Sequence, residues 1–194
     1  CIRDSIYRTI PKMTVINPCD DISAEELTSQ LLELNSPSYM RTTRNKVPRM
    51  YEDGEKLRIG EGSVLKEGGD LAIFSCGVMV GEAMAASDTL SAEGIECTVV
   101  DMHTIKPLDE NLISELAMRC GCFVSAEDHS VVGGLGGALS EWIAANNPIP
   151  LEMVGVKDIF GQSGGSSELM EMMGLTKSDI CEAARRSVGR KNRP

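Results

Sequence analysis

The chain has few of the residues that build metal sites. Only two of its 194 residues are histidines, and its seven cysteines include no CxxC pair. The one close pair, Cys120 and Cys122, has a spacing that suits neither the common zinc motifs nor a redox dithiol. We therefore assign no metal to this chain, and we expect the cysteines to be small core residues in a reducing, cytoplasmic compartment.

Long apolar runs and positive charge are also scarce. No apolar run is long enough to cross a bilayer, and 19 Lys and Arg stand against 29 Asp and Glu, a formal charge of −10. This charge disfavours a general nucleic-acid or anionic-membrane surface, although a local basic cluster can still bind a small anion. No signal or transit sequence is recognisable, and because the first residue is Cys we expect the chain to begin inside a longer protein.

What the sequence does contain is an alternation of apolar runs and helical patterns. The apolar runs lie at 71–76, 95–100, 122–127 and 150–156, and the helical patterns lie at 79–93, 111–119 and 135–146. Alternation of this kind predicts parallel strands joined by right-handed crossovers. The expected fold class is α/β, with an open, mostly parallel sheet flanked by helices.

Composition divides the chain into three stretches. Residues 1–50 have few predicted elements and can bury little surface alone, so we expect them to be the edge of a larger domain or to dock on the rest of the chain. Residues 51–69 are rich in charge and glycine, which is typical of a linker. Residues 70–194 contain the alternating pattern and are expected to form the main domain.

Further elements are predicted outside the alternation. We expect strands near 13–17, 38–41 and 57–59, and helices ending at residue 9 and spanning 23–34, 167–173 and 176–188. Ser23, with Glu26 three residues later, is the pattern of a capping box and predicts the start of helix 23–34. The basic stretch 185–194 lacks a core-facing pattern, so we expect it to fray.

Four basic residues follow the predicted strand at 38–41, namely Arg41, Arg44, Lys46 and Arg49. Side chains at the carboxyl end of a parallel strand face the usual ligand crevice of an open α/β sheet. Arginine matches phosphate or carboxylate with a planar fork of donors, so a phosphorylated ligand is one interpretation. The alternative is a solvated loop whose charges offset those of Glu52, Asp53 and Glu55.

Two histidines and a glycine-rich turn are weaker candidates. His103 and His129 follow predicted strands and could act as bases or phosphate donors, but His129 could equally hold its loop by bonding Asp128 or Glu127, and we expect it to be structural. The glycines of the turn are Gly133, Gly134, Gly136 and Gly137. They could cradle a phosphate, yet the spacing is not GxGxxG, and close packing of the helix on the sheet explains them as well.

Three segments resemble the carboxyl-terminal domain of the transketolase family: VVDMHTIKPLD (99–109), AEDHSVVGGLGGAL (126–139) and DIFGQSGGSSELMEMMGLTKSDI (158–180). Two more, RTIPKMTVINPCD (8–20) and SYMRTTR (38–44), resemble the end of that family's pyrimidine-binding domain. Within the family, HTIKPLD and YMRTTR look more like transketolase than like 1-deoxyxylulose-5-phosphate synthase or the beta subunits of 2-oxoacid dehydrogenases. The resemblance implies that residues 1–50 are a pyrimidine-binding-domain fragment and that 70–194 are the C-terminal domain.

The resemblance also implies an activity. Transketolases use thiamine diphosphate and Mg²⁺ to move a two-carbon ketol unit between sugar phosphates in the pentose phosphate pathway, and they work as dimers. The family's GDG motif and its activating glutamate, which serve the cofactor, are absent from this sequence. We therefore assign no catalytic or cofactor-binding residue here, and we expect the chain alone to be inactive and to need the N-terminal part or subunit of the same enzyme.

One functional residue of the family can be carried over. The arginine of the SYMRTTR segment that contacts the sugar phosphate matches Arg44, whereas strand alternation suggests that Arg41 points elsewhere. A non-catalytic assembly or regulatory module remains the alternative from another functional class.

Overall fold

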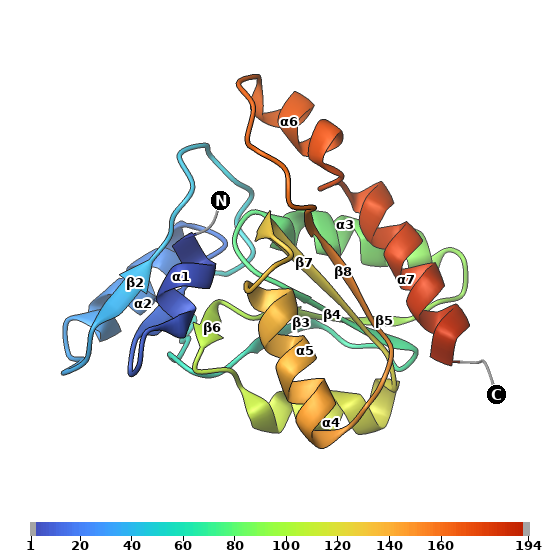
Figure 1. Ribbon diagram of the computed structural model, residues 1–194, viewed down its shortest axis with the longest axis horizontal. Helices are drawn as coiled ribbons and strands as arrows, with labels where there is room; N and C mark the ends of the chain where they lie inside the picture. Colours follow the sequence, from blue (N-terminus) through green and yellow to red (C-terminus); the bar gives the residue numbers. More distant parts are fainter. Residues whose placement is uncertain (1–2, 192–194) are drawn as a thin grey trace.

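The computed structural model describes residues 3–191, in which there are seven helices and eight strands (Figure 1). In chain order they are α1 (Arg3–Thr9), β1 (Thr14–Ile16), α2 (Asp21–Leu31), β2 (Ser38–Met40), β3 (Ser63–Lys66), β4 (Leu71–Ser75), α3 (Met79–Ser91), β5 (Cys97–Asp101), β6 (Thr104–Lys106), α4 (Glu110–Cys120), β7 (Phe123–Ser130), α5 (Leu135–Asn146), β8 (Leu151–Val156), α6 (Ser166–Met173) and α7 (Lys177–Lys191). None of these helices combines the length and the apolar character that a membrane crossing requires.

The main sheet has five strands in the order β3-β5-β4-β7-β8. Strands β5, β4, β7 and β8 are parallel to one another, and β3 pairs antiparallel with β5 at one edge. Every residue of β4 and β5 is buried, which explains why their sequences are mainly apolar rather than alternating, with Ser75, Thr98 and Asp101 as the buried polar exceptions. The predicted fold class is therefore confirmed.

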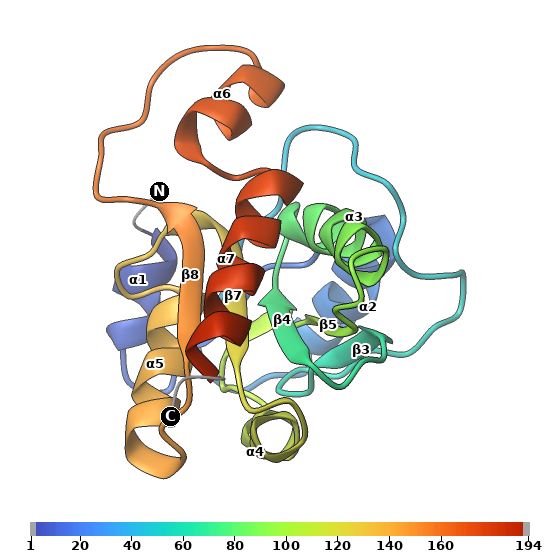
Figure 2. The same cartoon turned by 90° about the vertical axis from the view of Figure 1, so that its right-hand side faces the viewer.

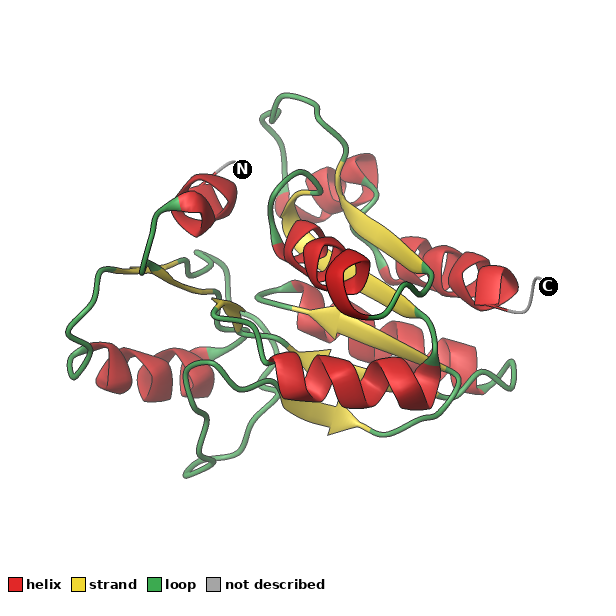
Figure 3. Cartoon of the chain, turned by 60° about the horizontal axis from the view of Figure 1, so that its bottom comes forward, coloured by secondary structure: helices red, strands yellow, loops and turns green. Residues whose placement is uncertain are grey.

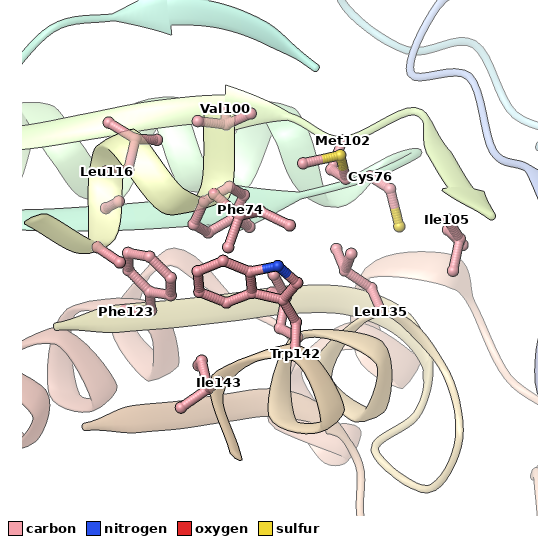
Figure 4. Packing of buried hydrophobic residues seen from close by; sticks show 14 of the residues in the cluster. Phe74, Cys76, Val100, Met102, Ile105, Leu116, Phe123, Leu135, Trp142 and Ile143 are labelled. Atoms are coloured by element: carbon pink, nitrogen blue, oxygen red, sulfur yellow. The ribbon is translucent and has the colours of Figure 1, made fainter. Parts of the chain in front are cut away.

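Helices cover both faces of this sheet (Figure 2). Successive residues of β4 point to opposite faces, so Phe74 packs with α4 and α5 while Ile73 packs with α3 and α7. On the first face, Phe74 and Phe123 meet edge to face with ring centroids 4.8 Å apart, and Trp142 of α5 lies beside them (Figure 4). These aromatic contacts pack α5 against strands β4 and β7.

A second, three-stranded sheet has the order β2-β1-β6 (Figure 3). Strands β1 and β2 are parallel, whereas β6, which was not predicted, pairs antiparallel with β1 through Ile16 and Thr104. The first fifty residues therefore do not complete their sheet alone, since β6 comes from the loop after β5. The stretch 51–69, predicted to be a linker, contains the buried Tyr51 and strand β3, which joins the main sheet. The domain division at 50 and 70 stays a prediction.

Helix α2 begins at Asp21 rather than at residue 23, and the predicted capping box is wrong. Asp20 is the N-cap: its Oδ1 accepts from the Ser23 amide at 2.8 Å, and Ser23 Oγ accepts from the Asp20 amide at 3.0 Å. Ser23 is thus the third residue of the helix. The capping pattern was present in the sequence but was assigned three residues too late.

The strand expected at 57–59 does not form. Gln30 of α2 takes the place of a partner strand, because its side chain donates to Leu57 O at 2.7 Å and accepts from the Ile59 amide at 3.1 Å. The expected fraying from residue 185 is also wrong for the described part, since α7 continues to Lys191. Arg185 binds Glu93, and Arg190 binds Glu152, while residues 192–194 lie outside the described part.

Candidate functional site

The basic stretch 41–49 forms a loop that leaves the small sheet at the end of β2. The Arg41 amide still donates to Ile16 O at 2.9 Å, which extends the ladder between β2 and β1 by one residue. The loop then runs through exposed residues and returns to α2, where the amides of Met50 and Tyr51 donate to Asp20 Oδ2 at 2.8 and 3.1 Å. One carboxylate therefore caps α2 and closes the loop.

A cleft of about 390 Å³ lies between this loop and the start of α2. Its lining residues are Pro18, Cys19, Asp20, Asp21, Ala24, Thr42, Thr43, Asn45, Lys46, Val47 and Arg49. Arg49 is bound to Asp21, and the hydrogen bond and charge of Arg49 lower the pKa of that carboxyl. Lys46 makes no ion pair with any described residue, so the free positive charge in the cleft wall is that of Lys46.

Arg44 projects from the same loop but does not line the cleft. Its side chain is exposed, and it forms no hydrogen bond or ion pair with any residue from 3 to 191. It is neither buried in apolar surroundings nor neutralised by a carboxylate, so the guanidinium is available to an anionic ligand. Its role in binding phosphate stays a prediction.

Arg41 points elsewhere, as strand alternation suggested. Its guanidinium donates to both oxygens of Asp128 at 2.7 Å and, through Nε, to Asp4 at 3.1 Å. Burial alone would lower the pKa of Arg41, but the hydrogen bonds and charges of Asp128 and Asp4 outweigh it and raise the pKa. Arg41 is therefore a permanently charged structural residue between the two carboxylates.

His129 is also structural, but not through the expected partners. It is fully buried, with Nδ1 2.8 Å from Ser130 O and Nε2 3.4 Å from Ser5 Oγ. Asp128 is taken by Arg41, and the Glu127 carboxylate is 3.6 Å away. Burial lowers the pKa of His129, which makes it a poor phosphate donor at neutral pH.

The glycine-rich turn is already occupied by a carboxylate of the chain. Glu127 accepts from the amides of Leu135 and Gly136 at 2.8 and 2.9 Å. These two amides at the start of α5 are therefore not available to bind a phosphate. Burial raises the pKa of Glu127 to about 7. A Cβ on Gly136 would lie 2.7 Å from Met153 Sδ, which supports the packing explanation of the glycines over the phosphate cradle.

Asp101 and His103 are buried polar residues at and just after the end of β5, in environments that were not predicted. Tyr51 donates its hydroxyl to Asp101 Oδ2 at 2.9 Å, and burial raises the pKa of Asp101 to about 7. His103 is equally buried, and burial lowers its pKa to about 4, so it is neutral at physiological pH. Its Nδ1 lies 3.1 Å from Thr104 Oγ1. The only sequence signal for this group was the polar end of a buried strand.

The described residues do not fit thiamine diphosphate and Mg²⁺, which the resemblance implies for the full enzyme. Mg²⁺ bound with a diphosphate is held by one or two protein carboxylates beside phosphate and water oxygens, and residues 3–191 contain no group of three or more His, Cys, Asp or Glu side chains placed to hold a metal ion on their own. The helix-start amides considered for the diphosphate are those bonded to Glu127.

The fold places the chain in a structural class: it is an open α/β protein with a five-stranded, mostly parallel sheet. Residues 60–180 match the family described as Transketolase, C-terminal domain. The chain therefore belongs to the transketolase C-terminal domain family, as the sequence resemblance indicated.

Curated relatives and solved structures agree with this assignment. The 6-deoxy-6-sulfo-D-fructose transketolase subunit SqwH of Clostridium sp. (strain MSTE9) is 41% identical over 188 residues, which are 97% of this chain and 58% of the relative. An apulose-4-phosphate transketolase subunit of Phocaeicola vulgatus is 34% identical over 181 residues, 93% of this chain and 58% of the relative. A solved split gene transketolase, described as an inactive beta4 tetramer, has a TM-score of 0.96 at 38% identity and covers 98% of this chain and 63% of that chain.

The chain thus spans 58% of the length of these two curated relatives. Proteins named 1-deoxy-D-xylulose-5-phosphate synthase also match, so similarity alone does not separate the two reactions.

Proposed function

We propose that this chain is the C-terminal part of a thiamine diphosphate-dependent transketolase that transfers a two-carbon ketol unit between sugars with an anionic end. The observation that supports this most directly is Arg44, an exposed arginine without an ion pair to any described residue, at the carboxyl end of β2 beside a cleft. When bound in the full enzyme, the cofactor supplies the carbanion stabilisation that ketol transfer needs. The task of Arg44 is to bind and orient the anionic end of the sugar.

The class of sugar is suggested by the relatives' names and the chemistry of arginine. One relative is named for 6-deoxy-6-sulfo-D-fructose and another for apulose-4-phosphate. Sulfonate and phosphate both present oxygen atoms that a guanidinium fork can bind. We therefore propose a sugar phosphate as the substrate, with a sulfonated sugar as the second candidate.

The proposed activity requires a partner. The cofactor site would lie in an N-terminal part or subunit of the same enzyme, and the working enzyme would be a cytoplasmic assembly built on a homodimer. The solved relative described as a beta4 tetramer supports self-association of a similar chain, in a form described as inactive. Light scattering of the chain with and without its N-terminal partner distinguishes these assemblies.

Replacing Arg44 tests the substrate role. In the complete enzyme, Arg44→Ala should raise KM for a phosphorylated aldose by about 10- to 150-fold, because a hydrogen bond to a charged group contributes roughly 1.5 to 3 kcal/mol. The matched control is Arg58→Ala, since the Arg58 side chain is also exposed and lies outside the loop. An unchanged KM in Arg44→Ala, or an equal rise in both variants, would remove Arg44 from the site.

A further inference from the structure

The loop that presents Arg44 has almost no support of its own. Within 42–48, the hydrogen bonds to described residues are limited to that between the Asn45 amide and Thr43 Oγ1, at 3.4 Å. The position of the loop is therefore set at its two ends. At the far end, Asp20 holds the amides of Met50 and Tyr51.

At the near end, the Arg41 amide donates to Ile16 O at 2.9 Å, and the Arg41 side chain is a second anchor. Its two terminal nitrogens bind the two oxygens of Asp128 on β7, both at 2.7 Å, and its Nε binds Asp4 of α1. The Arg41 side chain is only 11% exposed and that of Asp4 only 1%. One guanidinium thus joins three elements that are far apart in the sequence.

The geometry of this contact determines what it can do. A buried ion pair gains little net stability over an apolar contact of the same size, because both charges lose their hydration. A two-point bond between a guanidinium and a carboxylate does, however, fix the direction of both groups. Lysine cannot reproduce it, since an ammonium is a point charge without the planar fork.

We propose that Asp128 is a positioning residue for the anion site: through Arg41, it fixes the direction in which the loop 41–49 leaves β2. Arg44 is three residues further, or about 10 Å of extended chain, so a small change of direction at Arg41 becomes a large displacement at Arg44. The main α/β domain would then contribute to substrate binding without touching substrate. This inference rests on the proposed function of Arg44.

The first experiment measures the loop itself and does not depend on catalysis. Trypsin cleaves after Arg44 and Lys46 only when the loop can adopt the extended shape that the protease binds. The rate of limited digestion, followed by mass spectrometry, therefore measures how easily the loop leaves its folded position. Asp128→Asn and Arg41→Lys should each be cleaved at these two sites at least fivefold faster than the parent chain. The control Glu93→Gln removes the 2.7 Å ion pair between Glu93, which follows the end of α3, and Arg185 of α7, and it should leave the cleavage rate unchanged.

The second experiment measures substrate binding in the complete enzyme. Asp128→Asn should raise KM for a phosphorylated aldose about tenfold, change kcat less than twofold, and leave KM for an uncharged aldose unchanged. In an Arg44→Ala background the same substitution should have no further effect on KM, because the group it positions is gone.

The outcomes separate the two proposals. If Arg44→Ala leaves KM unchanged, the proposed function fails, while cleavage rates still decide whether Asp128 holds the loop. If Arg44→Ala raises KM but Asp128→Asn changes neither the cleavage rate nor KM for the phosphorylated aldose, the positioning role is refuted. A fall in thermal stability with equal changes in KM for both aldoses would also refute it, because it indicates a purely structural residue.

Discussion

Asp101 offers a quantitative test of the structure through the pH dependence of folding. Its side chain is completely buried at the end of β5, Tyr51 donates to one of its oxygens, and the other oxygen has no hydrogen-bond partner among the described residues. Burial raises its pKa from the ordinary 3.8 to about 7, and the hydrogen bond from Tyr51 only partly opposes this. The folded chain therefore holds this proton more tightly than the unfolded chain does.

The sign of the effect is set by this order of pKa values. Below about pH 4 the carboxyl is protonated in both states and has no effect on stability. As pH rises from about 4 to about 7, the unfolded chain ionises first, and the free energy of unfolding falls by about 1.4 kcal/mol per pH unit. The total loss by pH 8 is on the order of 4 kcal/mol.

The substitution Asp101→Asn removes the titrating group and keeps an oxygen for Tyr51. Between pH 5 and pH 8, the free energy of unfolding of this variant should gain about 3 kcal/mol relative to the parent, measured by urea unfolding at each pH. Other titrating groups, Glu127 included, contribute equally to both chains and cancel in the difference. The control Tyr51→Phe retains the carboxyl and loses the hydrogen bond that lowers its pKa, so its free energy of unfolding should fall with pH at least as much as that of the parent. Parallel pH profiles of the parent and Asp101→Asn would refute a buried Asp101 that keeps its proton up to about pH 7.

Two further predictions concern the core and the cofactor. Phe74 is fully buried against Phe123, so Phe74→Ala should lower the free energy of unfolding by about 3 to 5 kcal/mol, whereas Val64→Ala on the half-exposed edge strand should cost about 1 kcal/mol or less. Similar losses in the two variants would contradict the packing. Isothermal titration of the isolated chain with thiamine diphosphate and Mg²⁺ should show no saturable binding, because the described residues lack the donor set; a clear micromolar isotherm would place a cofactor site in this chain.

The main sheet could be predicted because its sequence signals are local. A strand buried on both faces needs a largely apolar run, and β4 and the first residues of β5 and β7 show this directly, before Asp101 and Glu127 end the apolar runs of β5 and β7. Helices between them show amphipathic or capped patterns within a single segment, as Asp109 does when it accepts from the Leu112 amide at the start of α4. Only the neighbouring residues are needed to recognise such signals.

The elements that were missed depend on distant partners. Strand β6 is three residues long and exists because it pairs with Ile16, nearly ninety positions earlier. The segment 57–59 is extended in the sequence pattern, yet Gln30 satisfies its backbone groups and no strand forms. The end of α7 is basic, which is typical of a solvated tail, but Glu93 and Glu152 stabilise it. No local pattern contains this information.

At the candidate site, the different environments of Arg41 and Arg44 could not be predicted from the local sequence either. The two residues are three positions apart, have the same side chain and follow the same strand, so composition and spacing treat them alike. Their environments differ because Asp128, 87 positions away from Arg41, reaches the first and not the second. Arg41 is bound to Asp128, whereas Arg44 forms no ion pair with any described residue. The contact that distinguishes the two arginines is thus made by a carboxylate of β7, which the loop's own sequence does not reveal.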